Sequence, residues 1–151
     1  MAQNINKKVS NNFFARMKNK HGDNFLDYIK SDELARGTKH IFRELARGQI
    51  DLNVYGKYFL DKRVLQSCID VAFSEYDRAY YQTMGLDMLD KYYESNGITK
   101  DPNFITILMY NRMSLQAYKV IYDGFKQFEV NKNINYLVGI ANNLQQYRLA
   151  I

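Results

Sequence analysis

Few residues in this chain have side chains that could do chemistry near neutral pH. His21 and His40 are the only histidines, and neither lies in a metal-ligand spacing or beside a cysteine pair. Asp87 and Asp90 lie three residues apart, which puts both carboxylates on one helix face. They are either solvated there or bind a divalent cation. Phosphate-binding glycine loops and nucleophile elbows are absent. We therefore expect no catalytic, cofactor-binding or metal-binding residue, and a protein that is not an enzyme; a site assembled from dispersed carboxylates is the remaining enzymatic hypothesis.

The single cysteine, Cys68, has no partner for a disulfide within the chain. It stands among Leu65, Ile69 and Ala72, and no cationic cluster nearby in the sequence would lower its pKa. We expect a buried, reduced thiol that fills space in the core.

Basic residues gather in two stretches that could contact a negatively charged partner. The first precedes Gly22 and supplies the whole net charge of +5, because the rest of the chain holds 16 basic and 16 acidic residues. In the second, basic side chains recur at helical steps of four, three and four. The two sets are Lys7, Lys8, Arg16, Lys18 and Lys20, and Arg36, Lys39, His40, Arg43 and Arg47. They predict phosphate contacts with nucleic acid, or, as the simpler alternative, a solvated helix face on which Glu44 pairs with Arg47.

Charge is also polarised along the rest of the chain. Residues 36–63 hold seven basic and three acidic residues, whereas residues 70–101 hold three basic and seven acidic residues. Opposite charge on two segments of one chain suits head-to-tail association, in which the basic surface of one subunit meets the acidic surface of the next.

Tyrosine is in excess, with 13 residues and no tryptophan. Two adjacent pairs cannot have all their members facing one core, and tyrosine combines a large apolar area with a hydroxyl that tolerates water. Near the N-terminus, two phenylalanines form an apolar patch that either docks on a partner or packs the terminus against its own domain. The candidate interface aromatics are Phe13, Phe14, Tyr80, Tyr81, Tyr92 and Tyr93. Alternatively, the tyrosines stack on the bases of a nucleic acid, or they pack at the rim of the protein's own core.

Helix signals indicate which elements position these side chains. The longest helical stretch spans residues 61–97, with Asp61 as N-cap and Gly97 in the left-handed backbone conformation that ends a helix. Gly85 within it is a point of bending or division. A second helix runs from Ser31 to about residue 47. A third starts at Asp101 and Pro102 and runs to about residue 128, and Asn135 caps a final one.

Residues 49–60 have a different pattern from these helices. Ile50, Leu52 and Val54 alternate with polar residues, as in a short strand, but no second strand is evident. We interpret the segment as an extended connector.

These elements predict an all-α fold. We expect a single-domain helical bundle of four or five helices with a long central helix, residues 23–151, preceded by a basic N-terminal arm, residues 1–22. The hydrophobic fraction of 46% is that of a globular protein. No apolar run approaches about 18 residues and the start of the chain lacks the apolar segment of a secretory signal, so we expect a cytoplasmic or virion protein without a membrane partner.

The function expected from these features is that of a non-catalytic assembly or interaction protein, either a homo-oligomer or a subunit of a larger protein complex. Abundant Asn, Lys, Ile and Tyr have AT-rich codons and fit a low-GC bacterium or its phage, so phage connector and capsid accessory proteins are compatible classes. The alternative is a nucleic-acid-binding protein that contacts phosphates through the N-terminal arm and the Arg36–Arg47 helix face.

Overall fold

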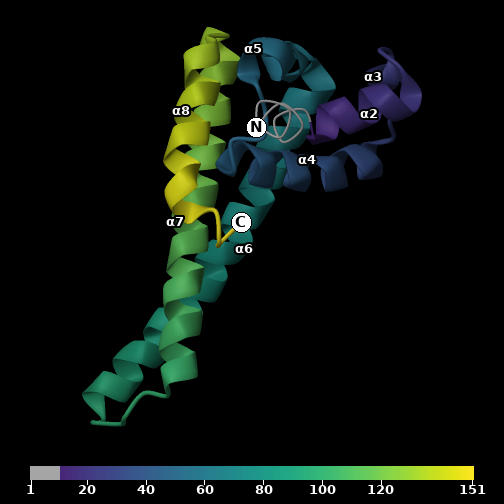
Figure 1. Cartoon of the computed structure of the whole chain (residues 1–151). Coiled ribbons are helices and arrows are strands. Elements are labelled where there is room, and N and C mark those ends of the chain that lie inside the picture. The colour runs from purple at the N-terminus through teal and green to yellow at the C-terminus, as the bar shows by residue number, and fades with distance from the viewer. Residues whose placement is uncertain (1–10) are drawn as a thin grey trace, which may run out of the picture.

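The computed structural model describes residues 11–151, which form helices and no strand (Figure 1). The elements are α2 (Phe13–His21), α3 (Phe25–Tyr28), α4 (Ser31–Ala46), α5 (Leu52–Tyr55), η1 (Gly56–Leu60), α6 (Lys62–Ser95), α7 (Pro102–Asn131), α8 (Ile134–Leu144) and η2 (Gln145–Tyr147). The prediction of an all-α helical bundle is confirmed. The described residues contain more α-helices than the four or five expected, because α3 and α5 are single turns of four residues.

Helices α6 and α7 form a long antiparallel hairpin whose ends are fixed by local signals. Asp61 accepts hydrogen bonds from the backbone N–H groups of Arg63 and Val64. Asp101 accepts one from the N–H of Asn103, and Pro102 is the first residue of α7. Gly97 has a φ of 63°, the left-handed conformation expected of it. Both predicted starts are therefore confirmed.

Helix α6 continues through Gly85 without a break. A glycine inside a helix costs about 1 kcal/mol relative to alanine, which the backbone hydrogen bonds and packing of the turns on either side can offset. The expectation that Gly85 divides this stretch is thus not met.

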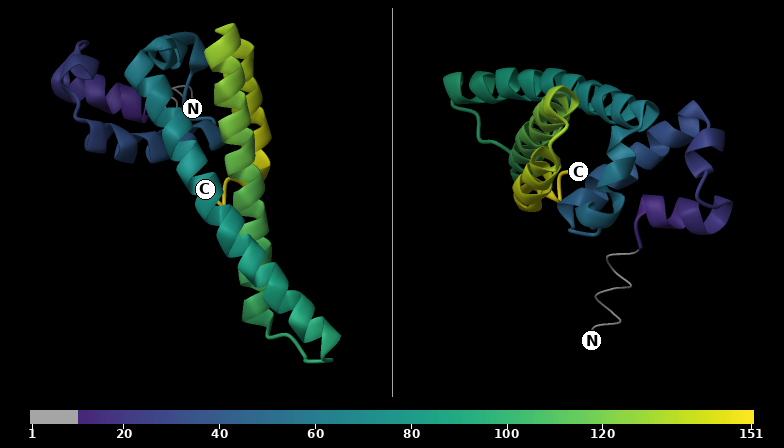
Figure 2. Two further views of the ribbon diagram at one scale, coloured as in Figure 1. Left: turned by 180° about the vertical axis from the view of Figure 1, so that it is seen from behind. Right: turned by 90° about the horizontal axis from the view of Figure 1, so that it is seen from above.

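The other helices surround only one end of the hairpin (Figures 1 and 2). We call these helices, together with the part of α6 and α7 that they surround, the head. Its core is rich in aromatic side chains, with Phe14, Phe42, Phe59 and Phe125 all fully buried. Cys68 lies in the same core as a free thiol, and burial raises its pKa, as its sequence neighbours predicted. None of the described helices contains an apolar segment long enough to cross a membrane.

Residues 13–21, expected to belong to a basic arm, instead form α2 and pack on the head. Phe13 and Phe14 are 4% and 0% exposed, so the interface role expected of these two side chains is wrong and the alternative, packing against their own domain, holds. The Phe13 ring occupies the space that a Cβ at position 37 would need, and Gly37 in α4 leaves that space open. Residues 1–10, with Lys7 and Lys8, lie outside the described residues.

Two further expectations are corrected by local backbone geometry. Residues 49–60 contain α5 and η1 instead of an extended connector, because without a neighbouring strand the backbone N–H groups find acceptors within turns, the first being the Asp51 side chain. The final helix is capped by Asn133, which accepts from the N–H of Asn135, so Asn135 is not the cap.

Candidate interaction surface

The part of α6 and α7 beyond the head is the most unusual feature of the described molecule. The large cluster of buried apolar side chains ends at Ala72 on α6 and at Ala117 on α7. From there the two helices run on together to the connection between them, and Ala79 and Leu108 are further buried apolar residues along them (Figure 2). We call residues 73–116 the projecting hairpin. At 1.5 Å per residue it extends on the order of 30 Å from the head.

A narrow line of contacts holds the two helices of the projecting hairpin together. Tyr93 packs edge-on against Phe104 with ring centroids 5.3 Å apart, and the Thr83 hydroxyl donates to the Asn111 carbonyl at 3.2 Å. Of the predicted interface aromatics, Tyr93 is therefore half-buried in this seam. The seam occupies one side of each helix and leaves the other sides open.

The charged residues along this seam pair with one another. Asp87 binds Arg112 at 2.6 Å, and Lys100 reaches both Asp90 and Glu94 at 2.7 Å. The hydrogen bonds that Lys100 donates to Asp90 and, second in size, to Glu94 raise the pKa of Lys100. Asp87 and Asp90, considered above as a pair that could bind a divalent cation, each pair with a basic side chain instead. The described residues contain no cluster of three side chains that could hold a metal ion.

Large apolar side chains are concentrated on the outside of the projecting hairpin. Twelve of the twenty exposed large hydrophobic residues in the described chain lie on it, although it makes up less than a third of residues 11–151. They are Phe73, Tyr80, Tyr81, Met84, Met88, Leu89, Tyr92, Ile98, Ile105, Ile107, Met109 and Tyr110. Scattered exposed apolar residues are normal, but a patch of this density is typical of a surface that contacts another molecule.

One row of these residues follows α6. Tyr76, Tyr80, Met84, Met88 and Tyr92 succeed one another at steps of four, and we call them the apolar ridge. Tyr76 is half-buried, whereas the other four are 44–66% exposed. Residues at i and i+4 form a continuous row on a helix surface, which is the geometry that packs into a groove of another helix. Tyr80 and Tyr92 are thus exposed, as a contact role would require, and Tyr81 beside the ridge is 60% exposed.

The basic residues predicted as a contact surface are distributed over α2 and α4, and many are already paired. Arg16 binds Glu44 at 2.9 Å, Lys18 lies 3.7 Å from Asp23, Arg36 lies 3.6 Å from Asp32 and Lys39 binds Glu75 at 3.0 Å. Arg43 donates to the Ile151 carbonyl at 3.0 Å. Lys20, His40 and Arg47 are exposed and have no ion pair with a described residue. The expected pairing of Glu44 with Arg47 is wrong, because Glu44 points to Arg16.

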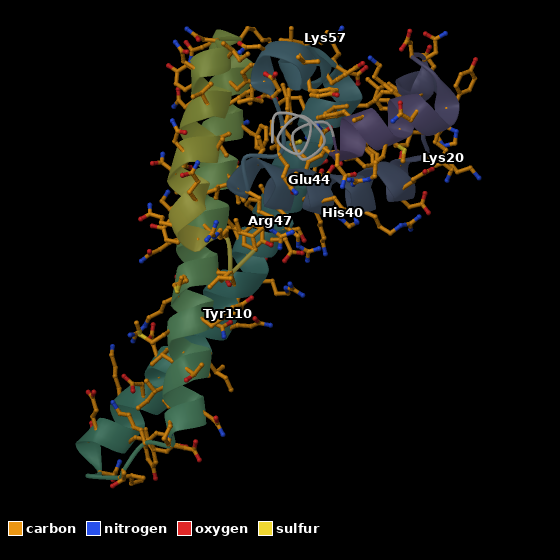
Figure 3. The ribbon with its side chains drawn as sticks, viewed as in Figure 1. Lys20, His40, Glu44, Arg47, Lys57 and Tyr110 are labelled. Carbon is orange, nitrogen blue, oxygen red and sulfur yellow. The ribbon has the colours of Figure 1, made fainter. Side chains whose placement is uncertain are left out.

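Four of these basic residues line one open hollow beside α4. Its volume is about 640 Å³, and its walls come from Asn11, Arg16, His40, Arg43, Glu44, Arg47 and Gln49. Figure 3 shows His40, Glu44 and Arg47 along α4, whereas Lys20 lies apart at the outer end of α2. The structure thus brings together Arg16, His40, Arg43 and Arg47 and leaves out Lys18, Lys20, Arg36 and Lys39.

Glu44 has a structural role that the sequence did not reveal. Its carboxylate is buried, accepts a hydrogen bond from the backbone N–H of Phe13 at 2.9 Å and binds Arg16 at 2.9 Å with its other oxygen. It therefore fixes the start of α2 to α4. The identical pentapeptides at residues 33–37 and 44–48 gave no sign of this difference, because the partner comes from 31 residues away.

Replacing Glu44 with alanine should lower the free energy of unfolding by about 1 to 2 kcal/mol, because it leaves the buried Phe13 N–H without an acceptor. Glu44→Gln keeps an acceptor and loses only the ion pair with the part-exposed Arg16, so a loss of under about 1 kcal/mol is expected. Urea denaturation of both variants measures the difference. Equal losses in the two variants would contradict the role given to the backbone hydrogen bond.

Comparison with protein-family models, with curated proteins and with solved structures found no match for this chain.

Proposed function

We propose that this protein is a non-catalytic assembly or interaction protein, a subunit of a larger protein complex, and that the projecting hairpin is its contact element. The observation that carries the proposal is the concentration of exposed Tyr, Met, Ile and Leu side chains on two helices that leave the head. Aromatic and methionine side chains are enriched in protein interfaces. Phage connector and capsid accessory proteins remain compatible classes.

The energetics of the hairpin favour a partner. Water contact with apolar surface costs about 25 cal/mol per Å², and a partner that covers the surface removes this cost. Only the excess over the entropy of association appears as affinity. Because the seam charges already pair within the chain, recognition along the hairpin rests mainly on apolar packing and should resist salt.

Light scattering at about 50 μM protein in low and high salt, with and without mixed-sequence DNA, tests this function. We expect a discrete oligomer without DNA that persists at high salt. Replacing Tyr81, Met88 and Tyr92 together with serine should convert it to monomer. The matched control replaces Val54, Val130 and Leu149, which are exposed on the head, and should leave the oligomer intact. A monomer that changes size only when DNA is added would contradict the proposal.

Nucleic-acid binding is the second candidate, and the hollow beside α4 is the observation that favours it. Three arginines and a histidine line this hollow with a single carboxylate, Glu44, so its surface carries excess positive charge. Phosphate groups bind such surfaces, and the affinity falls steeply as the salt concentration rises.

A paired substitution separates this candidate from non-specific attraction. The variant Arg43→Gln/Arg47→Gln should weaken DNA binding by at least about tenfold. The slope of the logarithm of affinity against the logarithm of salt concentration should fall by the amount expected for roughly two phosphate contacts. Lys119→Gln/Lys126→Gln on α7 also removes two positive charges, from residues that do not line the hollow, and should have little effect on DNA binding. Fluorescence anisotropy with labelled DNA provides the measurement, and equal losses in the two variants would argue against a binding surface at the hollow.

A further inference from the structure

We infer that the partner of the apolar ridge is a second copy of this chain, with the two α6 helices antiparallel about a two-fold axis at Met84. The inference rests on the proposed function, which by itself requires only that the projecting hairpin bind a protein. Three independent features of the ridge support this arrangement: charge, side-chain order and a glycine beside the axis.

The charges on the ridge face are complementary under this symmetry. Asp77 and Lys91 lie seven residues before and seven residues after Met84, about two helical turns, so all three share one face. Both charged residues are exposed, and neither has an ion pair with a described residue. Antiparallel pairing about Met84 places Asp77 of each copy opposite Lys91 of the other, which forms two ion pairs.

Other charges on the hairpin are used within the chain. Glu75 pairs with Lys39 and Arg78, and the seam acids pair with Arg112 and Lys100. The acidic segment expected to drive head-to-tail association is therefore largely neutralised by its own chain. The two exposed charges that remain on the ridge face, Asp77 and Lys91, match each other across a two-fold axis instead.

The apolar residues also match across this axis. Tyr80 and Met88 lie four residues on either side of Met84, and Tyr76 and Tyr92 lie eight residues on either side. Two-fold pairing therefore packs each Tyr80 ring against the Met88 sulfur of the other copy, whereas Tyr76 and Tyr92 point about 80° to either side of Met84 and lie along the edges of the contact. Methionine–aromatic contacts are favourable, so the residues at the centre of the apolar ridge meet matched partners.

Gly85 stands next to Met84, and no contact within its own chain requires a glycine there. A Cβ at this position would meet no atom within 4 Å, and α6 continues through it without a break. An alanine there would favour the isolated helix, so folding alone does not require glycine. A second helix crossing at Met84 gives the missing side chain a physical reason, because glycine allows two helix backbones to approach closely.

The available area suits a dimer of ordinary size. Phe73, Tyr80, Tyr81, Met84, Met88 and Tyr92 are 44–66% exposed. With about 200 Å² for each fully exposed side chain, they offer on the order of 600 Å². Asp77, Lys91 and the edges of α7 bring this toward the roughly 800 Å² per partner of a stable interface.

Charge reversal in the full-length chain tests the pairing. Asp77→Lys and Lys91→Asp should each weaken dimerisation at least about tenfold, because each puts like charges opposite one another twice. The double variant restores both ion pairs and should dimerise like the original protein. An equimolar mixture of the two single variants should form a heterodimer, since one copy then carries two lysines and the other two aspartates. Sedimentation measures the first two results, and native mass spectrometry identifies the third.

Cross-linking locates the axis directly. Met84→Cys should be joined to the second copy by a short bismaleimide linker, because the two positions face each other. Gln82→Cys, exposed on a different side of α6, is the matched control and should remain uncross-linked. The native Cys68 is buried and contributes no background.

Gly85→Ala should have opposite effects on the stability of the monomer and on dimerisation. It should raise the thermal stability of the dilute monomer and weaken dimerisation several-fold. An oligomer that disappears in the serine variant of the hairpin, but shows neither charge rescue nor the Met84→Cys cross-link, would overturn the two-fold arrangement and leave the proposed function standing. A protein that stays monomeric at about 50 μM would also overturn the two-fold arrangement, whereas the proposed function fails only if that monomer changes size when DNA is added and not with a protein partner.

Discussion

Replacing Phe14 with alanine should lower the free energy of unfolding by about 3 to 5 kcal/mol, the cost of removing a fully buried phenylalanine. The Phe14 ring is 0% exposed and packs against Tyr58 and Phe59, with ring centroids 5.1 and 5.3 Å away. Alanine leaves a cavity that these rigid rings cannot close. Guanidinium denaturation followed by far-ultraviolet circular dichroism measures the loss.

Loss of a ring at an exposed position provides the control. Tyr28→Ala removes an aromatic ring that is 77% exposed and lies outside the projecting hairpin, and it should cost less than about 1 kcal/mol. A small effect of Phe14→Ala would mean that α2 behaves as the loosely attached arm expected from the sequence. A large one establishes it as part of the domain, since an arm contributes little to global stability.

Gly124→Val should be destabilising by about 2 to 3 kcal/mol through overpacking, although glycine is a poor helix residue. Gly124 lies inside α7 where α8 crosses it, and a Cβ there would overlap the Ile140 side chain. Ile140 is only 2% exposed and belongs to the buried core. Relieving the overlap requires Ile140 to leave its packed position or the two helices to separate, and thermal denaturation should show a clearly lower midpoint.

Gly139→Val on the facing helix α8 is the matched control. A Cβ at Gly139 meets no atom within 4 Å, and an open hollow of about 320 Å³ beside it has room for the added methyl groups. We expect a change within about 0.5 kcal/mol. Similar losses at the two glycines would show that helix propensity, not close approach of α7 and α8, dominates.

The features that the sequence predicted correctly depend on residues close together in the chain. Asp61, Asp101 and Pro102 mark helix starts because a cap bonds to N–H groups two or three residues away. Cys68 was expected in the core because its helical neighbours are apolar. Exposed tyrosines on α6 followed from adjacent pairs, whose members point in different directions on any helix.

The features that the sequence missed depend on distant partners. Phe13 and Phe14 are buried because Gly37 and the residues around Tyr58 receive them, and Glu44 is buried because the start of α2 supplies a donor. The turns between residues 51 and 60 were mistaken for an extended segment, because a short alternating pattern does not distinguish a strand from a turn without knowledge of a neighbour.

By itself, the sequence determined that the chain is helical, where its long helices begin and which faces of them are apolar, since these properties arise from contacts within a few residues. Only the tertiary structure decided which apolar faces are covered. The head covers one end of α6 and α7 and leaves the other end open, and that choice depends on how five other helices pack together. The same long helix therefore contributes both to the core of the head and to the exposed ridge that we propose as the site of assembly.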